Sequence, residues 1–222
     1  MINILVRDYY KFYQQGIEAL LSFLFLSEYR ESVDFYYDLT PSNITRADII
    51  VIDLCAGEQL TCLSELKTAG HALIIGIVDS EFSSRTLLPG CLSHSVIIAR
   101  SESLAFSFAK IKFAVSKKMS FPELPVLKHC TACRVKTFSF QQRQVMEGFY
   151  RGENFHQLAN KLNVKHSTVF AHKYQVMDKL CLKNDYELYL LLKRLHQKNF
   201  FLPGTEPQSV GESSLLNDGN NQ

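Results

Sequence analysis

Acidic side chains follow two of the apolar runs in the N-terminal half of the chain. Asp53 lies near the end of the run at 47–54, and Asp8 follows the run at 2–6, directly after Arg7. A carboxylate can hold a divalent cation or act as a nucleophile. If both runs are parallel strands, their carboxyl ends meet at one edge of a sheet, where the sites of such sheets lie. This edge is the first candidate site.

The cysteines offer a second candidate site. Six cysteines at irregular spacing fit a reducing compartment better than a disulfide framework. Cys130 and Cys133 form a Cys-x-x-Cys pair, which could ligate zinc or cycle as a dithiol. A zinc site needs a second pair of ligands, and none follows at a suitable spacing. We expect two reduced thiols in a linker, with redox sensing as the alternative, and no metal or cofactor.

The elements that position Asp8 and Asp53 are predicted by the apolar pattern. Four runs without alternating polarity indicate strands that are buried on both faces of a parallel sheet, at 2–6, 47–54, 73–78 and 96–99. Segments of helix length separate these strands, and helices are predicted at 11–26 and 101–117. The pattern predicts a doubly wound α/β fold.

This arrangement resembles the receiver domain of response regulators, over residues 1–118, and the resemblance places the phosphoacceptor carboxylate on Asp53. Phosphotransfer there needs two further acids for a cation, a hydroxyl and a Lys. Here Arg7 replaces one acid, Arg100 stands near the place of the Lys, and the first hydroxyl after the third strand is Ser80. We therefore expect Asp53 to be a degenerate phosphoacceptor that pairs with a neighbouring base, for which Arg7 is a candidate.

Two short helices and a turn are predicted between residues 154 and 180. Asn154 suits the N-cap of the first helix, the turn falls near Asn163, and Ser167 suits the N-cap of the second. The apolar stripe of the second helix consists of Val169, Val176 and Leu180. Its opposite face would carry Phe170, Ala171, Lys173, Tyr174 and Met177. A helix with one buried stripe and one basic, aromatic face fits the major groove of DNA.

Flanking helices complete an all-α four-helix domain at 138–200. Ser139 and Gln142 have the spacing of a capping box, and Gly152 suits the end of that helix. A fourth helix is predicted at 185–197. Residues 119–137 would form a linker, and the Gly-, Ser- and Asn-rich residues 201–222 a disordered tail.

The overall charge of +2 hides a basic C-terminal domain. Residues 128–200 contain 13 Lys and Arg against 5 Asp and Glu, whereas residues 1–127 contain 11 against 14. This asymmetry favours a polyanionic partner for the C-terminal domain over the alternative of a helical bundle without a role in nucleic-acid binding.

The C-terminal domain resembles the DNA-binding domain of LuxR/FixJ-type regulators, over about sixty residues. The matching positions include Ser139, Val145, Met146, Gly152, Leu158, Ala159, Leu162, Thr168, Val169, His172, Lys179 and Leu180. The stretch 171–180 and the Lys-Asn-Asp at 183–185 resemble the Rcs-type branch. The chain departs from the family at Gln141 and Gln142, at Phe170 in place of Lys, and at Asp185 in place of Arg. These departures imply an altered sequence preference.

The resemblance assigns the residues that would contact DNA. Base edges would be met by Phe170, Ala171 and Tyr174, with Lys173 at a base or a phosphate. The backbone contacts, which set register, would come from Lys165, Ser167, Thr168 and Lys179.

These observations predict a cytoplasmic, sequence-specific transcriptional regulator that is not an enzyme. Such regulators read paired promoter half-sites in double-stranded DNA, so a homodimer or a heterodimer with another LuxR-type regulator is expected, with RNA polymerase as a further contact. The excess apolar residues of 101–117 fit either the core or a partner subunit. One alternative is an auxiliary interaction module that does not bind DNA alone. The other is a phosphotransfer or thiol-redox enzyme. No membrane contact is expected.

Overall fold

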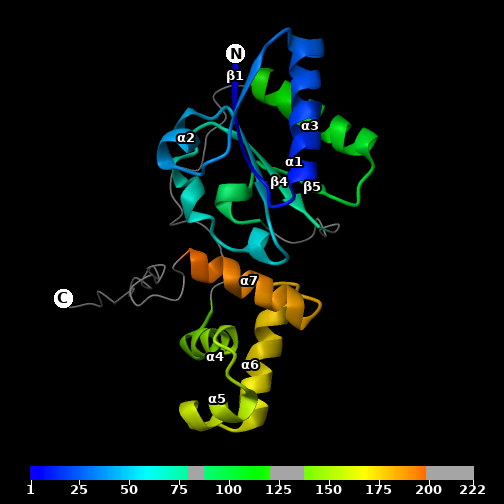
Figure 1. Ribbon diagram of the computed structural model, residues 1–222. Helices are drawn as coiled ribbons and strands as arrows, with labels where there is room; N and C mark the ends of the chain where they lie inside the picture. The colour runs from blue at the N-terminus through cyan, green and yellow to red at the C-terminus, as the bar shows by residue number, and fades with distance from the viewer. Residues whose placement is uncertain (80–87, 121–137, 199–222) are drawn as a thin grey trace, which may run out of the picture.

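The computed structural model describes residues 1–79, 88–120 and 138–198. A five-stranded parallel sheet forms the N-terminal part, and four helices form the C-terminal part (Figure 1). The strands are β1 (Ile2–Arg7), β2 (Val33–Tyr36), β3 (Ile49–Asp53), β4 (Leu73–Val78) and β5 (Val96–Ala99). Their order in the sheet is β2-β1-β3-β4-β5. This order, with the first strand inside the sheet, confirms the predicted doubly wound fold.

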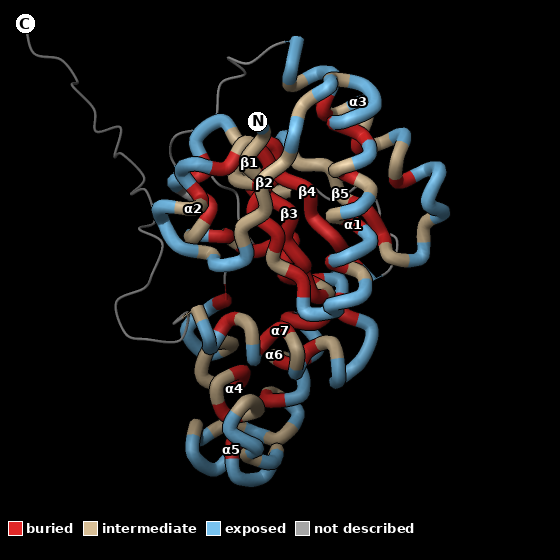
Figure 2. Tube along the Cα trace, turned by 45° about the horizontal axis from the view of Figure 1, so that its top comes forward, coloured by how far each residue is buried: buried red, intermediate tan, exposed pale blue. Residues whose placement is uncertain are grey.

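Both faces of the sheet are buried, which explains why the strands lack alternating polarity. In β3, Ile49 and Val51 pack on one side, whereas Ile50 and Ile52 pack on the other. Figure 2 shows the central strands β3 and β4 as the most continuously buried part of the molecule. The strand β2 was not predicted, because it lies at the edge of the sheet and its four residues are only half-buried.

Helices of ordinary length cover only one face of the sheet. That face is covered by α1 (Lys11–Leu24), which continues into the π-helix η1 (Phe25–Tyr29), and by α3 (Leu104–Ser120). Contact between the rings of Phe23 and Phe108, 6.2 Å apart, places the two helices side by side.

The opposite face has shorter covering elements than the sequence predicted. They are α2 (Pro41–Arg46) and the 3-10 helices η3 (Ser64–Thr68) and η4 (Gly90–Leu92). Between β3 and β4 the chain forms η2 (Glu58–Leu60) and η3 instead of an α-helix. The reason is visible in the spacing, because Leu60, Leu63, Leu66 and Ala69 are all buried and lie three residues apart. A period of three suits 3-10 turns.

The C-terminal helices are α4 (Phe140–Tyr150), α5 (Phe155–Leu162), α6 (His166–Lys179) and α7 (Asp185–Gln197). Capping boxes begin α4 at Ser139 with Gln142 and α5 at Asn154 with Gln157. The predicted N-cap of α6 was wrong. Lys165 holds that position without a side-chain cap, and Ser167 lies one residue inside the helix.

The two parts of the molecule meet at α7. This helix lies across the end of the sheet, between the strands and the helices α4 to α6 (Figure 1). Its Leu188, Leu191, Leu192 and Leu195 pack into the helical core, and the same core includes Cys55 and Leu60 from the loop after β3. The carboxyl edge of the sheet, where the sequence predicted a site, is therefore in contact with the helical domain.

The helices among residues 1–79, 88–120 and 138–198 are all too short or too polar to span a bilayer. The Cys130/Cys133 pair and the predicted linker and tail lie outside the described residues, apart from the ends of the linker at 119–120, which belong to α3.

Candidate nucleic-acid interface

The exposed side of α6 is a polar and aromatic surface. Ser167, Phe170, Ala171 and Tyr174 are all exposed, and Tyr174 retains 58% of its accessible surface. Lys165 is exposed at the start of the helix, while Thr168 and Lys179 are partly exposed. The structure thus brings seven of the eight predicted residues to one accessible helix, with its opposite stripe of Val169, Val176 and Leu180 fully buried.

Lys173 does not belong to this surface, so the prediction that it lies on the exposed face of the helix was wrong. Its side chain is 7% exposed, and its ammonium group lies 2.6 Å from a carboxylate oxygen of Asp185. The rings of Phe149, Phe155 and Tyr174 lie within 5.8 Å of the same nitrogen. Lys173 therefore fastens α6 to the start of α7. Met177, also predicted on the exposed face, is buried in the core.

Phe170 is held in place by a second aromatic ring. Its ring stacks on that of Phe155 in α5, with centroids 3.7 Å apart, and Phe155 meets Phe149 edge-on. At the position where the LuxR-type pattern has Lys, this chain presents an aromatic ring held by stacking. Such a side chain can contact a thymine methyl or a sugar but cannot neutralise a phosphate.

Asp53 lies at the carboxyl edge of the sheet between two guanidinium groups. Arg100 Nη2 donates to Asp53 Oδ1 at 2.8 Å and to both oxygens of Asp8, at 2.9 and 2.8 Å. Arg194 Nη2, from α7, donates to Asp53 Oδ2 at 2.5 Å. The expected pairing of Asp53 with a base is present, but its partners are Arg100 and Arg194. Arg7 forms no ion pair with any residue of the described ranges, so the suggestion of Arg7 was wrong.

Aromatic rings fix both guanidinium groups. Arg100 lies over Tyr10 and Tyr13, at 4.6 and 4.2 Å from the ring centroids, and Arg194 lies 4.0 Å over Tyr9. Burial alone would lower the pKa of Arg100, but hydrogen bonds to Asp53 and Asp8 raise it above its ordinary value. Both arginines therefore stay charged, and both oxygens of Asp53 are engaged.

A second ionic cluster joins α7 to the same edge. Lys198 Nζ lies 2.8 Å from Glu58 Oε1 and 2.7 Å from Glu65 Oε1. Burial would raise the pKa of Glu58, which is fully buried, but Lys198 and Arg194 together hold it below the ordinary value. Burial likewise lowers the pKa of Lys198, and Glu58 and Glu65 reverse this and raise it. The cluster holds its charges because they are paired.

Close packing surrounds these ion pairs. Gly57 has φ = 80°, and a Cβ at this position would lie 2.9 Å from Leu182 Cδ2 and 3.1 Å from Leu191 Cδ2. Arg194, Lys198 and Gly57 were not singled out from the sequence. A sequence signal for Arg194 and Lys198 was present, because the two cations are spaced i, i+4 at the end of a leucine-rich helix. The same spacing is equally typical of a helix face that is exposed to solvent.

Among the described residues, no group of three or more His, Cys, Asp or Glu could hold a metal ion. The acids near Asp53 are instead occupied by Arg100 and Arg194.

Comparisons with known proteins agree with this geometry. Residues 136–192 match the family model described as "Bacterial regulatory proteins, luxR family". A search of curated proteins found no match. Similar solved structures include RcsB from Salmonella enterica serovar Typhimurium bound to the promoter P1flhDC, with 20% identity over 86% of this chain and 97% of that chain and a TM-score of 0.53. A structure of two RcsB dimers bound to two parallel DNAs has 17% identity over 86% and 98%, with a TM-score of 0.50.

At these identities the solved structures establish the fold, and the family match establishes the type of helical domain. Residues 136–192 therefore match the helical domain of the luxR family, and the chain as a whole has the fold of the RcsB structures, in which an α/β domain precedes such a helical domain.

Proposed function

We propose that this chain is a sequence-specific DNA-binding transcriptional regulator that acts without phosphorylation of Asp53. The observation that carries the proposal is the exposed side of α6, where Ser167, Phe170, Ala171 and Tyr174 face solvent on a helix whose other side is locked into a core. Structures of RcsB bound to DNA have the same fold and add support. A helix presented in this way can enter the major groove.

The residues divide into two roles in this proposal. Lys165 and Lys179, near the two ends of α6, together with Ser167 and Thr168, would contact phosphates and set the register of the helix on the duplex. Phe170, Ala171 and Tyr174 would meet base edges, chiefly thymine methyl groups. We propose domain limits at 1–118, 119–137, 138–200 and 201–222.

Independence from phosphorylation follows from the occupation of Asp53. A phosphoryl group needs a free carboxylate oxygen, an approach path and a bound cation. Here Arg100 and Arg194 hold both oxygens, and the side chain of Asp53 is only 7% exposed. We expect acetyl phosphate to leave the affinity of the protein for DNA unchanged.

The DNA-binding proposal is tested by selecting duplex sites for the full chain and measuring affinity by mobility shift at several salt concentrations. Tyr174→Ala should cost about 1–3 kcal/mol on the selected site and flatten the preference among sequences. Lys165→Ala should weaken binding to all sequences alike and reduce the salt slope by about one unit. Arg46→Ala, an exposed cation at the end of α2, is the matched control and should change neither. Equal behaviour of all three variants would refute the assignment.

We further propose that the chain dimerises through the outer faces of α1 and α3. Phe12 and Phe23 on α1, and Phe106 and Phe113 on α3, lie on the sides turned away from the core and are 56% to 90% exposed. Large exposed apolar patches mark interaction sites. The partner would be a second copy or another LuxR-type regulator, and RNA polymerase is a further expected contact.

Sedimentation of the full chain tests the dimer. Phe113→Glu should shift the protein from dimer to monomer, because a carboxylate cannot be buried unpaired in an apolar interface. Phe140→Glu, at an equally exposed phenylalanine on α4, should leave the dimer intact. If both variants sediment like the parent protein, the interface lies elsewhere.

One observation favours the alternative of an auxiliary interaction module. Phe170 replaces a cation and Lys173 is buried against Asp185, so α6 presents fewer charges to phosphates than the family pattern implies. In this case promoter fragments would be bound only when a second LuxR-type regulator is present. The mobility-shift experiment, repeated with candidate partners, separates the two functions.

A further inference from the structure

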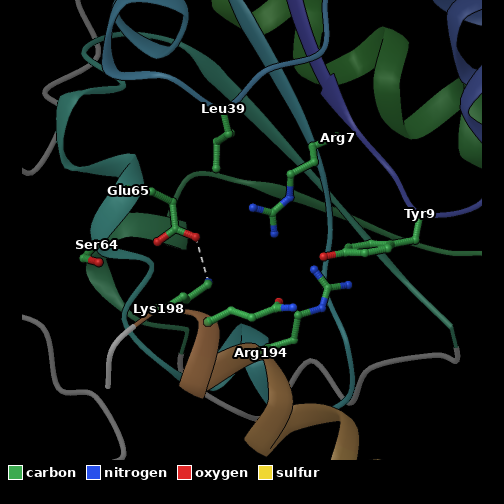
Figure 3. A pocket seen from close by; sticks show the side chains of 8 residues that line it. Arg7, Tyr9, Leu39, Ser64, Glu65, Arg194 and Lys198 are labelled. Carbon is green, nitrogen blue, oxygen red and sulfur yellow. Dashed lines mark ion pairs between the residues drawn. The ribbon is translucent and has the colours of Figure 1, made fainter. Parts of the chain in front are cut away.

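A cavity lies between the two domains, at the carboxyl edge of the sheet. Its volume is about 370 Å³, within the range of sites that bind small molecules. The first domain contributes Arg7, Tyr9, Leu39, Ser64 and Glu65, and the second contributes Arg194, Gln197 and Lys198 (Figure 3). The cavity exists only while α7 is docked on the sheet.

The lining is cationic. It contains three positive side chains, Arg7, Arg194 and Lys198, and a single acid, Glu65, which already pairs with Lys198. Arg194 directs one nitrogen to Asp53, whereas Arg7 has no acidic partner among the described residues. In Figure 3 the guanidinium group of Arg7 points from the end of β1 into the space between Leu39, Tyr9 and α7.

Two of the cations carry buried donors that the protein does not use. Arg7 Nε and Arg194 Nη1 are buried and have no hydrogen-bond partner within the described residues. A buried donor without an acceptor destabilises the folded chain. Native proteins satisfy nearly all such donors, and exceptions call for an explanation such as a bound ion.

We propose that this cavity binds a small molecule that carries a phosphate group, with Arg7 as its main anchor. The forked donors of a guanidinium match a phosphate in two-point contact. Arg194 Nη1 and the hydroxyl of Ser64 line the same space and can donate to the remaining oxygens. Arg194 and Lys198 already pair with acids, so Arg7, which has no acidic partner among the described residues, supplies the charge that fits an anionic ligand.

Ligand binding here would hold the two domains together, because both contribute to the lining. A ligand that binds only the docked arrangement stabilises it by mass action, and the effect on any other site is reciprocal. The cavity adjoins Asp53, so the edge that takes a phosphoryl group in an active receiver would here respond to a dissolved metabolite. This inference goes beyond the proposed DNA binding and does not depend on it.

Isothermal titration calorimetry of the full chain with pyrophosphate, inorganic phosphate and citrate tests the site in the absence of DNA. We expect pyrophosphate to bind with one molecule per chain, and Arg7→Ala to weaken this binding at least tenfold. Arg7→Lys should give an intermediate loss, since the charge remains and the fork does not. Arg46→Ala, an exposed arginine at the opposite edge of the sheet, should bind as the parent does.

Thermal unfolding distinguishes a binding role from a structural one. A structural Arg7 would lower the melting temperature when replaced, whereas we expect Arg7→Ala to leave it unchanged or raise it without ligand, and to lose the increase that pyrophosphate causes in the parent. Absence of binding to any of the three probes would overturn the proposal. So would binding that Arg7→Ala leaves intact, stronger binding of citrate than of pyrophosphate, or an equal loss in Arg46→Ala.

Discussion

At the scale of single residues, the molecule uses cations in three distinct ways. Arg100 and Arg194 neutralise Asp53 at the carboxyl edge of the sheet. Arg7 has no acidic partner in the described residues, and Lys173 packs α6 against the start of α7. Lys173 shows that residue type alone does not predict whether a side chain is exposed. A lysine on a helix usually keeps its ammonium in water, but its four-carbon stem can also cross an apolar layer to reach an acid at the far side.

The buried position of Lys173 predicts a loss of stability when it is replaced. Lys173→Ala removes the contact with Asp185 and with three aromatic rings, and should lower the free energy of unfolding by about 1–2 kcal/mol. Because Asp185 is largely exposed, no buried charge is left behind. Urea denaturation measures the change, and Lys165→Ala, on the exposed side of α6, is the control that should unfold like the parent.

At the scale of elements, α7 has two roles. Its leucines complete the core of the helical domain, and Arg194, with Lys198 just beyond its C-terminus, fastens that domain to the sheet. The recognition face of α6 is not used in this contact. Docking therefore restrains the orientation of the helical domain while leaving Ser167, Phe170 and Tyr174 exposed.

The tight contact at Gly57 predicts that docking is sensitive to one methyl group. Gly57→Ala should loosen α7 from the sheet, because the new Cβ would lie 2.9 Å from Leu182 Cδ2 and 3.1 Å from the carbonyl oxygen of Leu180. Small-angle scattering should report a larger radius of gyration. Gly70→Ala is a matched control, since Gly70 also has positive φ but its Cβ would meet only the carbonyl oxygen of Thr68, at an ordinary contact distance of 4.0 Å. Similar scattering from the two variants would mean that backbone strain, not the contact, matters.

At the scale of the whole molecule, the two domains are held together by charges that must stay ionised. The lowered pKa of Glu58 means that its contribution is present above the ordinary value of 4.5 and is lost as pH falls through the lower folded value. The raised pKa of Lys198 means that its contribution is present below 10.5 and is lost as pH rises through the higher folded value. Docking should be constant between these limits.

This pH dependence is measurable by scattering across the acid range. We expect a constant radius of gyration from about pH 5 to 10, and an expansion as the pH falls below the ordinary carboxyl value and through the lower folded pKa of Glu58, before or together with unfolding. Glu58→Gln should expand the protein already at pH 7, since it removes a charge that faces Lys198 and Arg194. Glu28→Gln, which breaks an exposed pair with Lys112, should follow the parent curve. A parent protein that stays compact after its carboxylates are fully protonated would contradict the role given to Glu58.

Much of the fold was open to prediction because it depends on local pattern. Continuous apolar runs specify β3 and β4, since both faces of the sheet are covered, and side-chain caps specify the starts of α4 and α5 within a few residues. The type of domain at 136–192 also follows from spacing. The half-buried β2 and the 3-10 turns after β3 were not predicted, because their sequence patterns are short and are not specific to one kind of secondary structure.

The sequence by itself determined the two domain types and the exposed aromatic residues of α6, because periodicity decides which side of an element is apolar. Only the tertiary structure decided the partners of the charges. Arg194 lies 141 positions from Asp53 along the chain, and Lys173 meets Asp185 across a helix junction. Ion pairs depend on distances of a few ångströms between distant segments, which no local pattern contains, and so the domain contact and its cavity appear only in three dimensions.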